Sequence, residues 1–511
     1  MTSITGSKLW ITVGVMCAAL MAVLDISIVN VGLSDIRASF GTPLDQIAWV
    51  STGYMMANIV VIPMTGWLQR RFGFKRYFAV SILMFTASSA LCGLAWNLPS
   101  LVLFRVLQGC GGGAIIPTSQ AILFARYPRN EHGMAGALFG LGAVTGPLLG
   151  PTLGGWLIEV STWHWMFLIN VPVGLTAAAL VYRHVEEPGF VPDQRPIDRF
   201  GFGLLLIGMA SLQYVLEEGN RDGWTDSPTI VTLFGVSVIA LVTLVVHVLE
   251  TKDPIVDLRI FLNRSYAAAT GINFILGISL FSGTFLYSLY CGAVMHYQAV
   301  DIGILFLKGS IIQLPIMILI GRFSSRFDGR KLVAFGIAGN VVSLWLNAHL
   351  GPQADEMTML GPIFARSLSL GFIFVPMSVI ALSDVLPKQR GNAAGLFNLT
   401  RELGGSIGTA WMSTSLDRRL HFHSAILREH VDAYNPIAQE QLRAMRGITG
   451  GTIDAQRGAL GILDLRVVQQ ALVRAFNEDF MVITFVFAAA LGLVFLLKRP
   501  SAAGPPPAGA H

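Results

Sequence analysis

The chain has 511 residues, of which 53% are hydrophobic and only 13% are charged, whereas a soluble domain carries charge on about a quarter of its positions. This composition excludes an ordinary soluble protein. A formal net charge of +5 would also suit a nucleic-acid binder, so the positions of the basic residues decide what that charge means.

Apolar stretches long enough to cross a bilayer recur along the whole chain. A spanning helix needs roughly 20 mostly apolar residues, and the sequence predicts fourteen such spans with short polar breaks between them. The first run is too long for a cleavable signal peptide, and no small-residue cleavage pattern follows it. The spans are expected to begin near Trp10, Ile47, Tyr77, Leu101, Met134, His164, Gly201, Thr229, Ser265, Ile302, Leu332, Met359, Asn392 and Phe480.

Basic residues set the expected orientation. With the N-terminus in the cytoplasm, most of the 35 Lys and Arg fall in cytoplasmic segments, where short loops retain positive charge. Both termini are therefore expected in the cytoplasm. The net charge then reports membrane topology and not a nucleic-acid surface.

The first span carries an acid in its middle, Asp25, followed by Asn30. An ionised carboxylate at this depth costs about 2.5 to 3.5 kcal/mol, so it should be paired or protonated. We predict that Asp25 carries protons and that Asn30 lines a substrate cavity. A carboxylate locked permanently in an ion pair is the alternative.

The fourth span contains Arg105 and Gln108. A guanidinium stays charged, so it can make proton binding by a nearby carboxylate depend on their separation. We predict that Arg105 takes part in proton coupling and that Gln108 belongs to the substrate cavity. For Arg105, a purely structural pin between helices is the alternative.

The fifth span is rich in glycine and proline. Glycines four apart lie on one helix face and allow close helix contact, while prolines remove intrahelical hydrogen bonds and permit bending. The pattern predicts a tightly packed helix that can bend, and ordinary close packing is the alternative. The residues are Gly146, Pro147, Gly150, Pro151, Gly154 and Gly155.

The chain contains an internal repeat. The loop from Gly66 resembles the loop from Gly321 at an offset of 255, and residues 133–150 align with 391–408 at an offset of 258, with seven identities in 18 positions. Two matches at nearly one offset, equal to eight spans, indicate two six-span halves. A substrate path is expected between the halves, near the bilayer midplane.

The repeat suggests where the chain divides. We expect an N-terminal half over residues 1–183, an inserted pair of spans with its loops over 184–264, and a C-terminal half over 265–498. Within the C-terminal half, residues 414–477 are expected to form one large outer segment with helix-compatible periods. The tail, 499–511, is expected to be disordered from its composition.

Charges inside the spans bear on the substrate. Six ionisable residues are expected there, and the net charge of the six is +2. Such a cavity should tolerate hydrophobic weak acids better than quaternary cations. A lysine that reaches the outer surface, or a glutamate paired nearby, would weaken this inference. The six are Asp25, Arg105, Lys308, Arg366, Arg401 and Glu402.

No metal site, cofactor or enzyme active site is expected. His421, His423 and His430 in the outer segment lack the spacing that a metal site needs. No nucleophile with a neighbouring base and no nucleotide-binding loop appears at the required spacing.

These motifs resemble those of the major facilitator superfamily, and most closely the EmrB type of its fourteen-span drug:proton antiporters, over nearly the whole chain. The resemblance implies an all-α membrane fold with two six-helix halves plus two inserted helices, fourteen transmembrane helices together. It makes the fifth-span pattern an antiporter motif. The loop after the second span resembles the gating loop through Gly66, Arg71, Gly73 and Lys75, but Arg70 stands where the family usually has Asp.

The function that the resemblance implies is proton-coupled antiport, exporting hydrophobic small molecules and drugs across a bacterial inner membrane by alternating access. The proton gradient supplies the work. A periplasmic membrane-fusion adaptor is expected on the outer segment, leading to an outer-membrane channel. A proton-coupled symporter that imports a metabolite is the alternative within transport, and a membrane receptor or enzyme is the alternative outside it.

Overall fold

The computed structural model describes residues 7–498 except 384, 387, 388, 430, 432–438, 441, 443 and 445–452. The tail 499–511, for which disorder is predicted, lies outside the described residues, as does part of the outer segment 414–477. Nearly all of the described chain is α-helical.

Each predicted span corresponds to one helix or to two consecutive helical pieces. Within the described residues, nine of these stretches are long and apolar enough to cross a membrane by length and composition. The helices are α1 (Lys8–Phe40), α2 (Leu44–Ile47), α3 (Trp49–Phe72), α4 (Phe74–Cys92), α5 (Leu98–Arg126), α6 (His132–Val160), α7 (Trp165–Leu168), α8 (Asn170–His184), α9 (Arg199–Glu218), α10 (Pro228–Glu250), α11 (Arg264–Ala293), α12 (Ala299–Ser310), α13 (Gln313–Phe323), α14 (Gly329–Asn347), α15 (Glu356–Leu382), α16 (Arg390–Glu429) and α18 (Ile453–Val494).

Local polar residues fix where several helices begin. Asn97 and Ser100 form a reciprocal capping box at the start of α5, which satisfies backbone N–H groups that the first turn leaves without partners. The Asn263 side chain accepts from two backbone N–H groups at the start of α11. Gly73 separates α3 from α4 with φ of +80°, a conformation that a side chain would strain.

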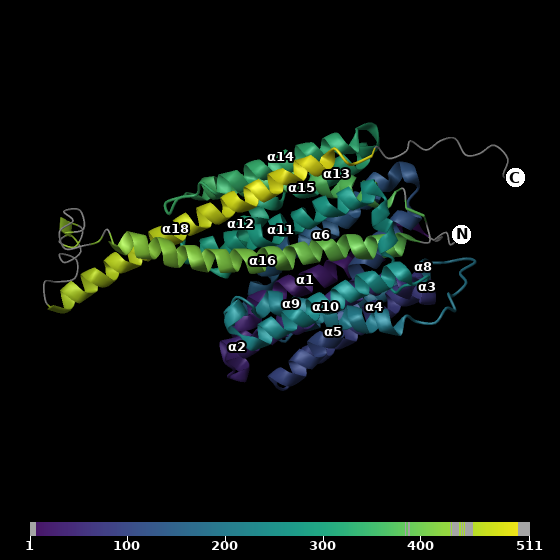
Figure 1. The fold of residues 1–511 in the computed structure, drawn as a ribbon, viewed down its shortest axis with the longest axis horizontal. Coiled ribbons are helices and arrows are strands. Elements are labelled where there is room, and N and C mark those ends of the chain that lie inside the picture. Colours follow the sequence, from purple (N-terminus) through teal and green to yellow (C-terminus); the bar gives the residue numbers. More distant parts are fainter. Residues whose placement is uncertain are drawn as a thin grey trace.

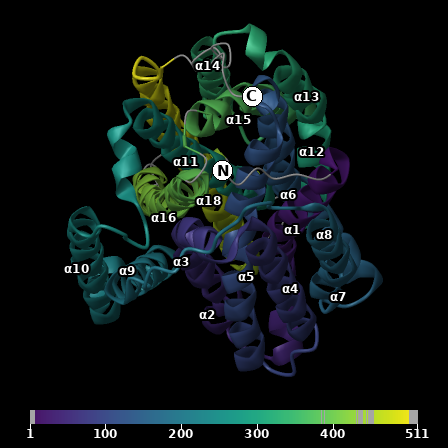
Figure 2. The same cartoon turned by 90° about the vertical axis from the view of Figure 1, so that its right-hand side faces the viewer.

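The helices form two packed groups with an interface between them. In the first group α1 packs on α5, α6 and α8, and in the second α11 packs on α15, α16 and α18. Between the groups, α3 and α5 contact α16, while α6 contacts α12, α13 and α15 (Figure 2).

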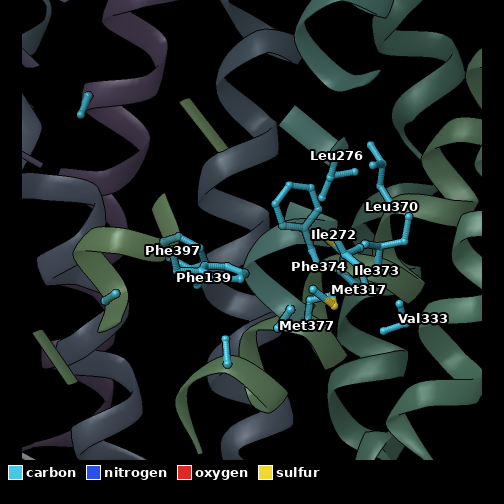
Figure 3. Close-up of a cluster of buried hydrophobic side chains, with 14 of the residues drawn as sticks. Phe139, Ile272, Leu276, Met317, Val333, Leu370, Ile373, Phe374, Met377 and Phe397 are labelled. Carbon is cyan, nitrogen blue, oxygen red and sulfur yellow. The ribbon is translucent and has the colours of Figure 1, made fainter. Parts of the chain in front are cut away.

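A buried hydrophobic cluster crosses this interface. It joins α6 to helices of the second group, and it includes Phe139 and Phe397, which the internal repeat aligns with each other. Figure 3 shows their rings close together, beside side chains from α11, α13 and α15. The repeat therefore places equivalent residues on the two sides of one contact.

The inserted pair, α9 and α10, packs as a hairpin at the edge of the bundle (Figure 2). Helix α9 contacts α3 from one group and α16 from the other. Glu218 on α9 accepts from Thr52 on α3 at 3.4 Å, and Gln213 donates to Ser406 on α16 at 3.2 Å. The pair thus covers the seam between the two groups on one side.

The last two long helices extend beyond the rest of the bundle. Figure 1 shows α16 and α18 projecting together on the left. The start of α1 and the end of α18 lie at the opposite end of the bundle. At its base, buried Asp479 accepts from Ser415 at 2.6 Å and lies 3.1 Å from the Arg419 guanidinium. Farther out, Arg428 pairs with Asp464 at 2.9 Å. We call this projection, residues 415–429 and 453–479, the helical extension.

The helical extension changes one sequence expectation. The last span was expected to begin near Phe480, but α18 already begins at Ile453. A polar helix outside a membrane carries no apolar run, so span prediction does not detect it. Residues 414–429 and 453–477 of the outer segment are therefore continuations of α16 and α18.

Candidate functional site

A cavity of about 270 Å³ lies between the two groups of helices. Apolar side chains of α1 and α3 form much of one wall, while polar and charged side chains gather on the other. Asn30, which lines the cavity as predicted, is exposed and marks where the cavity meets the surface. Residues used below that line it are Ala22, Ile26, Asn30, Tyr54, Met55, Thr284, Phe306, Gln313, Arg366, Asn398, Arg401 and Glu402.

Asp25 and Arg105 form a buried ion pair directly behind one cavity wall. The Arg105 Nη1 atom lies 2.6 Å from Asp25 Oδ2, and both side chains are at most 1% exposed. The ring of Tyr54 lines the cavity, and the Arg105 guanidinium lies 4.2 Å from its centre. One aromatic ring therefore separates the pair from the cavity.

Neutral side chains complete the surroundings of Asp25. Gln108 and Asn170 each donate to Asp25 Oδ1 at 2.8 Å. Gln108 also accepts from Arg105 at 2.8 Å. Gln108 thus belongs to the ion pair and does not line the cavity, which differs from its expected place.

The Asp25 carboxyl group therefore accepts three side-chain hydrogen bonds and faces one guanidinium. Removing one partner of a buried pair leaves the other charge uncompensated. The pair thus joins α1 to α5 at a buried point next to the cavity.

On the opposite side of the cavity lie three further charges, those of Arg366, Arg401 and Glu402. The nearest atoms of Arg401 and Glu402 are 3.7 Å apart. Arg366 donates to the Thr284 hydroxyl at 2.9 Å. All three residues line the cavity, and their role in substrate binding stays a prediction.

Lys308 lies elsewhere. Its ammonium pairs with Glu356 at 2.5 Å, and its side chain is 52% exposed. The long lysine stem carries the charge to the surface, so Lys308 is not a cavity residue. The charges that line the cavity, two arginines and one glutamate, therefore sum to one positive charge instead of the expected excess of two.

The glycines of the fifth span pack α6 against α1, the helix that carries Asp25. A side chain at Gly146 would overlap Val23, and one at Gly150 would overlap Ser27. At Gly154, an added Cβ would lie 3.3 Å from the Ile28 carbonyl oxygen, whereas Gly155 faces Val300 on α12. The side chains of Pro147 and Pro151 lie outside the described part of the structure. Close helix contact is thus present at each of these glycines.

Replacing Gly150 with Val is expected to lower the melting temperature in detergent and the amount of folded protein, because the new side chain would overlap Ser27. Overpacking of this kind typically costs about 1 to 3 kcal/mol. Gly235→Val on α10 is the matched control, since a Cβ there meets nothing within 4 Å. Equal melting temperatures for the two variants would contradict the packing account.

The loop between α3 and α4 is held by acids from a distant segment. Glu187 accepts from the backbone N–H groups of Phe74 and Lys75, each at 2.9 Å. A Cβ at Gly73 would lie 2.7 Å from that carboxylate, so glycine is required there. Arg71 donates to the backbone oxygen of Asp193 at 2.5 Å.

These acids supply negative charge that the motif itself lacks. Arg70 occupies the usual Asp position, and its guanidinium lies 4.0 Å from the Asp193 carboxylate. Sequence reasoning missed Glu187 and Asp193 because both follow α8, more than 100 residues along the chain. The one sequence feature that could have indicated these two residues is the group of acids in the loop after α8, whose last turn is basic.

Gly66 contacts the other group of helices at the end of the bundle where α1 begins, which we call the terminal end. A Cβ on Gly66 would lie 2.6 Å from the Asn392 Cα atom, and one on Gly321 would lie 2.5 Å from the Ala137 Cβ atom. Asn398 donates to Gln120 across the same interface at 2.7 Å. The repeated loops thus each pack on the opposite half, and the terminal end is closed.

Gly66→Ala is expected to disfavour this closed arrangement, because the methyl group would overlap the backbone of Asn392. Distances between spin labels at exposed Phe72 and Phe327 should then lengthen in a larger fraction of molecules. Gly361→Ala, where a Cβ meets nothing within 4 Å, should leave the distribution unchanged. Identical distributions for both variants would contradict the closure role of Gly66.

Comparisons with known proteins agree over nearly the full chain. A profile described as Major Facilitator Superfamily matches residues 15–409. The Multidrug export protein EmrB of Escherichia coli (strain K12) is 34% identical over 511 residues, covering 98% of this chain and 97% of that protein. The Fatty acid resistance protein FarB of Neisseria gonorrhoeae is 32% identical and covers 97% of each.

Among solved structures, the human organic anion transporter MFSD10 has a similar fold. Its TM-score is 0.57 at 13% sequence identity, and the match covers 94% of this chain and 99% of that one. At this identity the likeness concerns the fold alone.

Proposed function

The chain belongs to the major facilitator superfamily and to its EmrB-type branch, and from that premise we propose that it exports hydrophobic small molecules and drugs across a bacterial inner membrane in exchange for protons. It is a transporter and not an enzyme. The proposal rests above all on one observation, the cavity that lies between two repeated halves with a buried ion pair behind its wall.

The arrangement of the halves supports alternating access as the mechanism. We propose that residues 1–183 and 265–498 move relative to each other around the cavity, with residues 184–264 as the inserted pair. The contacts of Gly66 and Gly321 close the terminal end in this conformation. With both termini in the cytoplasm, this is the state in which the cytoplasmic entrance is shut.

Proton coupling is assigned to Asp25 and Arg105. Protonation of Asp25 would release Arg105, and the guanidinium would then move against Tyr54, whose ring lines the cavity. A change at the pair therefore reaches the substrate through one side chain. The proton gradient is the energy source, and no cofactor takes part.

The direction of transport is supported by α6. Its glycines pack directly on the segment of α1 that carries Asp25. Bending of α6 would therefore displace the segment that carries Asp25. A symporter that imports a metabolite on the same fold is the second candidate. A membrane receptor would need neither the ion pair nor the repeated closure contacts.

The helical extension supports a partner outside the membrane. It carries a small buried cluster of its own around Ala459 and Leu463, and it is longer than a connection between two spans requires. We propose that it docks a periplasmic membrane-fusion adaptor, which leads onward to an outer-membrane channel.

Everted membrane vesicles distinguish antiport from symport. With an acid lumen, an antiporter accumulates a hydrophobic fluorescent substrate inside, and a protonophore stops the accumulation. Protons and substrate leaving the lumen together would favour the symporter. Substrate movement that ignores the gradient would contradict both.

A further inference from the structure

Arg366 is a half-buried cation for which the described residues provide no salt-bridge partner. It lies on α15, its guanidinium lies 5.4 Å from the centre of the Phe306 ring, and its hydrogen bond to Thr284 is to a neutral group. Its Nε atom is buried without a hydrogen-bond partner. Within the described residues no salt bridge includes Arg366, whereas Arg105 and Lys308 each face a carboxylate.

Two more donors without partners point to the same wall. Gln313 is 2% exposed and its Nε2 atom has no hydrogen-bond partner, and Arg401 is 5% exposed with Nη1 in the same condition. All three residues line the cavity. Asn398 adds one acceptor, Oδ1, that also lacks a partner. Buried donors left without acceptors are costly, so this wall is suited to a ligand that accepts hydrogen bonds.

The charge of the wall selects among such ligands. Arg401 has Glu402 within 3.7 Å, which offsets its charge in part, so Arg366 carries the net positive charge. A neutral acceptor would satisfy the hydrogen bonds but leave that charge uncompensated in the cavity wall. A monovalent anion satisfies both.

A small side pocket behind Arg366 does not take the anion itself. It has a volume of about 10 Å³, which is room for about one water molecule. The hydroxyl of Ser343 in its wall donates to the Pro362 carbonyl, and the Oδ1 atom of Asn347 is an acceptor without a partner. The pocket therefore suits a hydrating water, and the anion must approach Arg366 from the main cavity.

We propose that this wall is an anion subsite, with Arg366 as the principal partner and Gln313 as the second donor. Its ligand is a monovalent oxyanion, the carboxylate end of a hydrophobic molecule, whose apolar part lies against Ala22, Ile26 and Met55 across the cavity. The inference rests on the proposed function for the statement that this cavity receives substrate.

Equilibrium binding to the full chain in lipid nanodiscs tests the subsite. The probes are a medium-chain carboxylate, its methyl ester and the trimethylammonium compound of equal chain length, each competing at pH 8 with a bound fluorescent hydrophobe. We expect the carboxylate to bind at least tenfold more tightly than the ester, the factor that corresponds to 1.4 kcal/mol. Arg366→Met should abolish this preference, and Arg366→Lys should retain part of it.

Lys308→Met is the matched control. Like Arg366→Met, it replaces one positively charged side chain with methionine, but it does so at an ion pair on the surface. The preference for the carboxylate over the ester should therefore persist. Equal or tighter binding of the ammonium compound by the wild type, or equal effects of Arg366→Met and Lys308→Met, would overturn the proposal. The measurement needs no gradient, so its failure is distinct from failure of proton coupling.

A second arm separates substrate from free inorganic anions. Melting temperatures are compared in chloride and in gluconate. A chloride-dependent rise that is lost in Arg366→Met, without any carboxylate preference, would support the anion site and assign it to a small inorganic ion. If the wild type shows neither a carboxylate preference nor a chloride effect, the proposed anion site is wrong.

Discussion

Replacing Asp25 with Asn is expected to abolish transport driven by a pH gradient while leaving substrate binding measurable. The amide has nearly the same shape and can still accept from Arg105, but it cannot take up a proton. Loss of gradient-driven accumulation in everted vesicles, together with unchanged binding in nanodiscs, is the expected pair of results.

The variant also leaves the Arg105 guanidinium buried without its anion. Removing one partner of a buried pair typically costs about 3 to 5 kcal/mol, so the amount of inserted protein and its melting temperature must be measured alongside transport. Gln108→Leu is the matched control, because it removes one hydrogen bond to Asp25 but keeps the titratable group. Full gradient-driven transport by Asp25→Asn would refute the assignment.

Deleting residues 424–470, which include the outer part of the helical extension, is expected to end resistance that depends on an adaptor while preserving insertion and substrate binding. A short linker replaces the deleted residues. The cut spares Ser415, Arg419 and Asp479, whose contacts join α16 to α18 at the base. The buried Asp479 therefore keeps its partners, and the membrane part should fold.

Two comparisons make this deletion informative. The variant Arg428→Ala breaks the ion pair with Asp464 on the exposed surface of the extension, and because such pairs contribute little, resistance should remain. Cells without the adaptor should show no difference between the deletion and the full chain. Unchanged resistance of the deletion in adaptor-containing cells would remove the docking proposal.

The sequence predicts the spans and the architecture well because membrane insertion depends on local apolar length. Charges in mid-span also require partners, which is why Asp25 and Arg105 could be recognised as candidates from their positions. The structure puts them in contact. Their role in proton coupling stays a prediction.

What the sequence does not reveal is which neutral side chains surround the charges. Asn170 lies 145 positions from Asp25, and Tyr54 reads as an ordinary aromatic residue of an apolar span. Lys308 was misplaced because its stem is long enough to reach Glu356 at the surface. The sequence also does not show that α16 and α18 continue beyond the bundle, because a polar helix carries no run of apolar residues.

Substrate-driven proton movement in proteoliposomes tests the central claim, proton-coupled antiport, most directly. The vesicles contain a pH-sensitive dye, and a hydrophobic substrate without a group that titrates near neutral pH is added outside. As substrate enters through the protein, protons should leave and the lumen should become alkaline, and Asp25→Asn should abolish this change. Substrate entry without any change in lumenal pH, or with acidification, would contradict the account.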